Sequence, residues 1–290
     1  MPPGRTDRPP ATGGTAVTNR TYAFPPGGLP PQSDSPVGTA VFTTAYAVIP
    51  AITMRDIVTS FLPNWIHTRA WILARPLTGF AETFAQYAIE LAPGGGSAEP
   101  EPDVEAQAVL FVAHGTARLT LGRDVHELRA GSFVYIPPSA VWTLWNTSDK
   151  PCGIHWIRKR YEPAPGMAPP EAKVTHDSEV PSATMPDCDG VWSTQRFLDP
   201  LDLRYDFHAN IVTFLPGGRI PFAETHVMEH GLYVLQGTGK YLLNTDWVDV
   251  GPGDFMWLRA FCPQACIATG DEPFRYLLYK DVNRHPKLHL

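Results

Sequence analysis

The chain has 290 residues, of which 43% are apolar and 18% are charged, and its formal net charge is −6 at pH 7. The apolar share excludes global disorder, and a negative charge without a long Lys/Arg run argues against a nucleic-acid partner. No stretch approaches the roughly 20 apolar residues of a membrane span, and the N-terminus lacks an apolar signal core. We therefore expect a cytoplasmic protein with no membrane partner.

The N-terminal segment, residues 1–38, contains nine Pro and six Gly and shows no apolar periodicity. This composition predicts an arm without regular structure, which is either dispensable or held against the body of the protein. The four cysteines have no finger-like spacing, which predicts neither a disulfide framework nor structural zinc.

Short apolar runs of β-branched and aromatic residues then follow one another at intervals of about ten residues, and each ends at Gly, Pro, Asn or Asp. This pattern predicts an all-β sandwich or barrel. The expected strands in the first half are Ala40–Ile49, Ala70–Ala74, Phe84–Leu91, Ala108–Val112, Arg118–Leu121, Ser132–Ile136, Ala140–Trp145 and Ile154–Ile157. Those in the second half are Ile211–Phe214, Gly231–Leu235, Lys240–Leu243, Asp254–Leu258, Gln264–Ala268 and Arg275–Tyr279. Short helical turns are expected only near Met54–Leu62 and Asp199–Tyr205.

The two halves are related by an internal repeat with an offset of 122 residues. The offset places Gly115-Thr116 on Gly237-Thr238, and it also superposes Gly131 on Gly253, Phe133 on Phe255 and Arg158 on Lys280. Two copies of a β unit of roughly 100 residues explain these matches. We expect an N-terminal unit at residues 39–161, a Pro-rich linker at 162–192 and a C-terminal unit at 193–290.

The residues with metal-ligand chemistry lie in the second copy. Glu224, His226 and His230 have the same parity, so on an extended strand they would project to one face. Glu229 has the opposite parity and is expected to point away. One carboxylate and two imidazoles suit a borderline or hard divalent ion, although the same residues could be ordinary half-buried polar groups.

The spacing Gly-x5-Glu-x-His-x3-His-x6-Gly resembles the first metal motif of the cupin superfamily, with the carboxylate and the outer His exchanged. Gln264, after Gly253-Asp254 and Pro263, stands where the second cupin motif supplies its ligand. The predicted metal site is Glu224, His226, His230 and Gln264. Its oxygen ligands favour Mn²⁺, with Fe²⁺, Co²⁺ and Zn²⁺ as alternatives.

The first copy acts as an internal control. At the offset of 122 the four ligand positions become Pro102, Val104, Ala108 and Trp142, none of which coordinates a metal well. We therefore expect the first copy to lack a metal site and to serve packing and assembly.

Tyr276 and Lys280 share strand parity near the end of the second copy, so both are predicted to face the barrel interior, as is Tyr241. A Lys in a cavity needs an anionic partner, because its desolvation costs several kcal/mol. That partner is either a carboxylate-bearing substrate or Glu224. For the two tyrosines, simple core packing is the alternative.

Together these residues resemble the (S)-ureidoglycine aminohydrolase family of allantoin catabolism, whose bacterial members are also called glyoxylate-induced proteins. The segments that carry the likeness are Glu224–Gly231, Gly237, Trp247, Gly253-Asp254, Gln264, Tyr276, Tyr279–Asp281 and Asn283-Arg284. The likeness extends over most of the chain from about Ala40, and it is thin before residue 40.

This resemblance implies a bicupin, that is, two double-stranded β-helix (jelly-roll) barrels, with one Mn²⁺ in the second barrel. It also implies hydrolysis of (S)-ureidoglycine to (S)-ureidoglycolate and ammonia, a C–N bond cleavage. Glu224, Tyr241, Gln264, Tyr276 and Lys280 match the family's substrate contacts. Glu224, as a proton shuttle, and Lys280, as the partner of the substrate carboxylate, are the expected catalytic residues.

Two other function classes stay open at this point. One is a different metal-dependent cupin enzyme, a dioxygenase or isomerase acting on a small carboxylate, which dependence on O₂ would distinguish. The other is a non-catalytic bicupin for storage or sensing, which would bind no metal. The low charged fraction further predicts a homo-oligomer.

Overall fold

The computed structural model describes residues 40–54, 62–76, 79–281 and 284. The predicted arm at residues 1–38 and most of the predicted turn at Met54–Leu62 lie outside these residues. Within the described part the chain folds almost entirely into strands, and Asp199–Tyr205 contains turns rather than a helix. None of the helices in the described part is long and apolar enough to cross a membrane.

The strands of the first half are β3 (Trp65–Ala74), β4 (Ala85–Ser97), β5 (Ala106–His114), β6 (Thr116–Leu121), β7 (Asp124–Arg129), β8 (Ser132–Ile136), β9 (Trp142–Trp145) and β10 (Cys152–Arg160). Those of the second half are β13 (Trp192–Arg196), β14 (Phe207–Phe214), β15 (His230–Gln236), β16 (Gly239–Leu243), β17 (Asp246–Val250), β18 (Phe255–Leu258), β19 (Gln264–Ala268) and β20 (Phe274–Asp281). The remaining elements are β1 (Val41–Phe42), β2 (Tyr46–Ile49), β11 (Lys173–His176), β12 (Ser182–Thr184) and the 3₁₀ turns η1 (Ala51–Thr53) and η3 (Asp177–Glu179).

The repeat is visible strand by strand. β4 begins at residue 85 and β14 at 207, β9 at 142 and β19 at 264, and β10 at 152 and β20 at 274, so each pair is separated by the predicted offset of 122. Gly115 and Gly237 occupy equivalent turns with φ of 78° and 70°. A Cβ at Gly115 would lie 2.6 Å from the carbonyl oxygen of Pro151, and one at Gly237 would lie 2.4 Å from that of Pro273. Both turns therefore require glycine.

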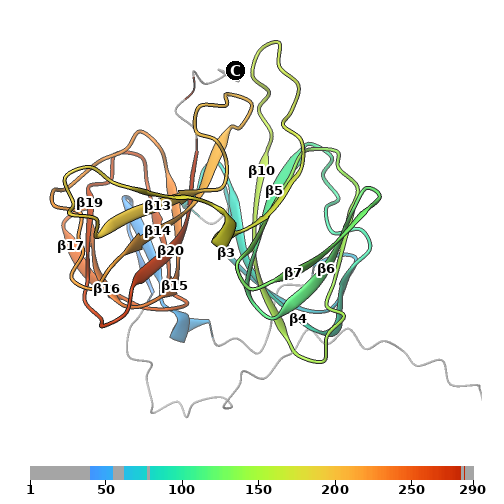
Figure 1. Cartoon of the computed structure of the whole chain (residues 1–290), viewed down its shortest axis with the longest axis horizontal. Helices are drawn as coiled ribbons and strands as arrows, with labels where there is room; N and C mark the ends of the chain where they lie inside the picture. Colours follow the sequence, from blue (N-terminus) through green and yellow to red (C-terminus); the bar gives the residue numbers. More distant parts are fainter. Residues whose placement is uncertain (1–39, 55–61, 77–78, 282–283, 285–290) are drawn as a thin grey trace, which may run out of the picture.

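The halves form two curled antiparallel lobes side by side, the first drawn mainly in green and the second in orange and red (Figure 1). In the second lobe, one sheet has the order β1-β2-β18-β15-β20-β14-β13-β12, and the smaller sheet β17-β16-β19 faces it. The sheet of the first lobe has the order β11-β8-β5-β10-β4-β9-β6-β7, with β3 paired to β4.

Strand pairing crosses between the halves at two places. β1 and β2 lie within residues 39–161, the range predicted for the N-terminal unit, yet β2 pairs with β18 of the second half. The segment predicted as a linker contributes β11, which pairs with β8 of the first half. The expected single strand Ala40–Ile49 is instead a hairpin, in which the Thr43 hydroxyl donates to the Tyr46 carbonyl oxygen at 2.9 Å.

Three apolar cores result. One fills the first lobe and includes the aromatic side chains Trp65, Tyr87, Trp142 and Trp156. A second lines the second lobe and includes Tyr241 and Tyr276. The third lies between the lobes, where residues of both halves pack together. Alternation along β20 explains the division: Tyr276 and Leu278 face the second lobe, whereas Leu277 and Tyr279 face the core between the halves.

Candidate metal centre

The second lobe contains a cavity of about 100 Å³ that brings together all the predicted site residues, namely Glu224, His226, His230, Tyr241, Gln264, Tyr276 and Lys280. They come from β15, β16, β19, β20 and the loop before β15. Because the two sheets curl around the cavity, residues up to 56 positions apart in the chain line it together.

Glu224 and His226 do not lie on a regular strand, so the expectation of a continuous extended ligand strand from 224 to 230 was wrong. Glu224 is instead held by an isolated bridge to Gln264: the backbone N–H of Glu224 donates to the Gln264 carbonyl at 2.9 Å, and the reverse bond measures 2.8 Å. The backbone of Phe261 donates to the His226 carbonyl at 2.6 Å. The loop carrying both ligands is therefore fixed by residues 261–264.

His230 opens β15 and lies opposite Lys280 in the ladder with β20, so both side chains emerge on the cavity face. Burial, and to a smaller extent the neighbouring charges of His226 and Lys280, lower the pKa of His230 to about 3. The imidazole is consequently neutral near pH 7, with one nitrogen free to act as a ligand.

Gln264 and the two tyrosines form the inner wall. The Tyr241 hydroxyl donates to Oε1 of Gln264 at 2.9 Å and lies 3.5 Å from the Tyr276 hydroxyl. All three side chains are buried. Burial raises the pKa of Tyr241 and of Tyr276 well above its ordinary value, so both phenols stay protonated and can donate.

The donor set fits a divalent ion in type. Nε2 of His226 lies 3.4 Å from Oε1 of Glu224, and the rings of His226 and His230 lie 5.0 Å apart. Two imidazoles, a carboxylate and an amide oxygen match Mn²⁺ and its neighbours in the divalent series. Across the described residues, no group of three or more His, Cys, Asp or Glu side chains is arranged closely enough to hold a metal ion as it stands.

The equivalent positions of the first half offer no such donors. Val104 is 68% exposed, whereas Ala108 and Trp142 are buried within the apolar core of that lobe. Arg158, the counterpart of Lys280, lies over the Trp156 ring at 4.9 Å and is paired with Glu101.

Three polar residues of the cavity, Thr194, Arg196 and Asn210, were not identified from the sequence. Arg196 on β13 and Asn210 on β14 lie opposite each other in the ladder and line the same cavity. Arg196 is close enough to lower the pKa of Lys280, in addition to the larger effect of burial. Among the described residues, neither Lys280 nor Arg196 is paired with a carboxylate. Neither Arg196 nor Asn210 belongs to a motif, and only the parity of β13 and β14 could have indicated them.

Comparison with known proteins agrees with this architecture. The cupin domain family matches residues 87–158 and 210–279. Over 81% of its length the chain is 33% identical to the (S)-ureidoglycine aminohydrolase of Arabidopsis thaliana, covering 76% of that protein. It is 30% identical to the (S)-ureidoglycine aminohydrolase of Escherichia coli K12, covering 80% of this chain and 88% of that one. A structure from Pseudomonas aeruginosa, designated a glyoxylate-induced protein, is 57% identical with a TM-score of 0.85, over 93% of this chain and 99% of that chain.

Proposed function

The chain belongs to the (S)-ureidoglycine aminohydrolase family of bicupins, and from this membership we propose that it hydrolyses (S)-ureidoglycine to (S)-ureidoglycolate and ammonia in purine degradation. The observation that carries the proposal is the second-lobe cavity, which Lys280 lines together with Glu224, His226, His230 and Gln264, and in the described part of the chain Lys280 is paired with no carboxylate. A small carboxylate would supply the missing counter-charge.

Glu224, His226, His230 and Gln264 would hold one Mn²⁺ or a related divalent ion. When bound, such an ion supplies Lewis-acid stabilisation of charge on the substrate. The neutral state of His230 and the Tyr241 bond to Gln264 prepare two of these ligands, because the imidazole needs no deprotonation and the amide oxygen is already oriented.

Each remaining role in the proposed reaction falls to a side chain of the protein. Lys280 pairs with the substrate carboxylate, and Arg196 adds positive charge to the same wall. The phenols of Tyr241 and Tyr276 donate hydrogen bonds that orient the substrate's polar groups. Glu224 carries the proton: it takes one from the attacking water and delivers it to the leaving amine, so that a C–O bond forms, the C–N bond breaks and ammonia departs.

The experiment that tests this function is ammonia release from freshly generated (S)-ureidoglycine, with Mn²⁺ added or chelated. We expect metal-dependent release well above spontaneous decay, and loss of both bound metal and turnover in Glu224→Ala. Turnover that requires O₂ would instead support an oxygenase, and a rate equal to spontaneous decay would contradict the proposal.

The low charged fraction supports a further proposal, a homo-oligomer, and four cysteines without the spacing of a disulfide framework support another, a cytoplasmic location. Sedimentation of the purified protein tests the first, because a monomer would contradict it. Cell fractionation tests the second.

A further inference from the structure

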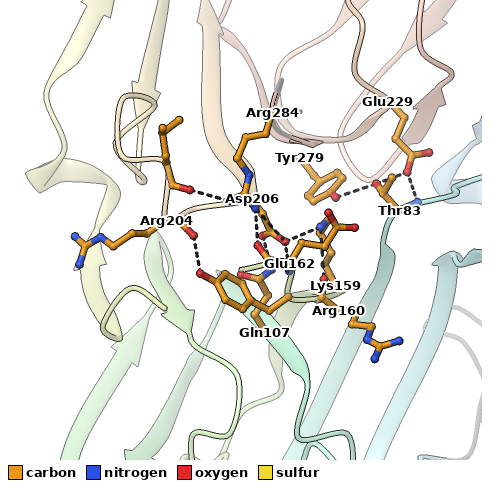
Figure 2. Close-up of polar contacts among 12 residues, drawn as sticks. Thr83, Gln107, Lys159, Arg160, Glu162, Arg204, Asp206, Glu229, Tyr279 and Arg284 are labelled. Carbon is orange, nitrogen blue, oxygen red and sulfur yellow. Dashed lines mark hydrogen bonds and ion pairs between the residues drawn. The ribbon is translucent and has the colours of Figure 1, made fainter. Parts of the chain in front are cut away.

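The first half contacts the metal motif of the second half through Glu229, the residue directly before His230. Glu229 is 5% exposed, and its carboxylate accepts four hydrogen bonds. Oε2 accepts from the backbone N–H of Glu82 and from Nε1 of Trp257, both at 2.9 Å. Oε1 accepts from the backbone N–H and the hydroxyl of Thr83 (Figure 2).

The same segment of the first half also lies against Gly231, the residue directly after His230. A Cβ on Gly231 would lie 2.7 Å from Cζ of Phe84 and 2.8 Å from Oε1 of Gln86. Phe84 in turn stacks on Tyr279 at 4.1 Å, and the Tyr279 hydroxyl lies 3.1 Å from Oγ1 of Thr83. Residues 82–86 therefore contact both neighbours of His230 in the chain.

Glu229 and His230 are neighbours in the chain, but their side chains enter different parts of the molecule. Successive side chains of an extended chain point to opposite faces, so Glu229 enters the boundary between the halves while His230 enters the cavity. The regular ladder begins only at His230, because residues 221–229 form no strand beyond the single bridge at Glu224.

We propose that Glu229 and Thr83 are positioning residues for the metal centre: the first half, without ligands of its own, anchors the Glu229 carboxylate and so orients His230 toward the metal. This inference rests on the proposed function, because it requires that His230 is a ligand. Partners that orient a metal ligand typically contribute 10- to 100-fold to metal affinity.

The test measures Mn²⁺ affinity by titration calorimetry and the Mn²⁺ environment by electron paramagnetic resonance. Glu229→Gln turns an NH₂ group toward one pair of donors, and we expect Mn²⁺ binding about tenfold weaker, a changed resonance spectrum and a lower kcat. Because that variant also loses a buried charge, Thr83→Val provides a milder change that removes only the hydroxyl. Thr83→Ser keeps the hydroxyl and should restore wild-type affinity.

Asp206 provides the matched control, because it is a second buried carboxylate at the boundary between the halves (Figure 2). It is hydrogen-bonded to Gln107 and paired with Lys159 of the first half at 2.7 Å. Asp206→Asn should lower the melting temperature and leave Mn²⁺ affinity per folded molecule unchanged.

The outcomes separate the two proposals. If Glu229→Gln and Thr83→Val lower only the melting temperature, as Asp206→Asn does, and bind Mn²⁺ like the wild type, the positioning role is wrong while the metal site stands. If the wild-type protein itself binds no Mn²⁺, both proposals fail.

Discussion

The two halves of the molecule arrange equivalent strands around different interiors. Where the second half has Gln264 in a cavity lined by polar donors, the first has Trp142, which belongs to an apolar core and borders a hollow of about 210 Å³. Trp142 contacts Trp156 edge-on at 6.0 Å, and Trp156 in turn contacts Trp65 at 5.5 Å. The comparison teaches that side chains at a few inward positions decide whether such a lobe presents polar donors or apolar groups to its interior, because the backbone is shared.

The charged residues follow the same division. Arg158 of the first half is satisfied within the protein by Glu101 and the Trp156 ring. Lys280, its counterpart, is half-buried and forms no ion pair with any described residue, and burial together with the charge of Arg196 lowers its pKa. An unsatisfied buried cation costs stability unless a ligand completes it. The cation of the first half thus finds its partners within the fold, while for that of the second half we propose a partner in the substrate carboxylate.

The largest expected difference in metal binding and activity is between alanine variants of His226 and of its equivalent in the first half, Val104. His226→Ala removes an imidazole ligand, so we expect bound Mn²⁺ to disappear and ammonia release to fall to the spontaneous rate, whereas Val104→Ala should change neither. Elemental analysis and the ammonia assay check both. Full activity in His226→Ala would break the distinction between the halves.

A second variant addresses packing in the first half. Trp142→Ala leaves a large cavity, so the free energy of unfolding should drop by about 3–5 kcal/mol. Urea denaturation measures this, and Mn²⁺ content per folded molecule should stay at the wild-type value. At the equivalent position of the second half, Gln264→Leu should have the opposite effect: ammonia release should be lost, while the free energy of unfolding should change little. Equal stability losses in the two variants would argue that both lobes are merely packed cores.

The equivalent cations provide a third comparison. Arg158→Met leaves Glu101, whose side chain is 8% exposed, without its partner, and should lower the free energy of unfolding by about 2 kcal/mol. Lys280→Met should not lower it, but should raise KM for the substrate about tenfold, as expected for one lost charge-assisted hydrogen bond. An unchanged KM would remove Lys280 from the substrate site.

The smallest expected effect is a pH dependence of stability in the metal-free protein. Burial lowers the pKa of His155 in the first half to about 3, as it does for His230. Above pH 6.5 neither folded nor unfolded histidine is charged, and as the pH falls below 6.5 only the unfolded chain binds the proton, so stability decreases. His155→Phe should reduce the loss of unfolding free energy between pH 7.5 and 5.5 by about 1 kcal/mol. An unaltered pH profile would show that His155 is not buried as a neutral group.

The sequence predicted much of the fold through local signals. The spacing of apolar runs and the offset of 122 predicted strands that the structure contains, because inward-facing positions and tight turns constrain residue type locally. Tyr276 and Lys280 were found from their shared strand parity, whereas the four candidate metal ligands were found from their spacing, which resembles the cupin motifs.

What the sequence by itself determined is therefore the repeated β unit, the donor residues at its second copy and their absence from the first. Only the tertiary structure decided that β2 joins the second lobe, that Glu224 and His226 lie on a loop fixed by residues 261–264, and that Glu229 is held by Thr83. These features depend on contacts between residues as much as 200 positions apart, as between Tyr46 and Asp246. Periodicity indicates which face of a strand is buried, but it does not indicate which distant segment of the chain covers that face.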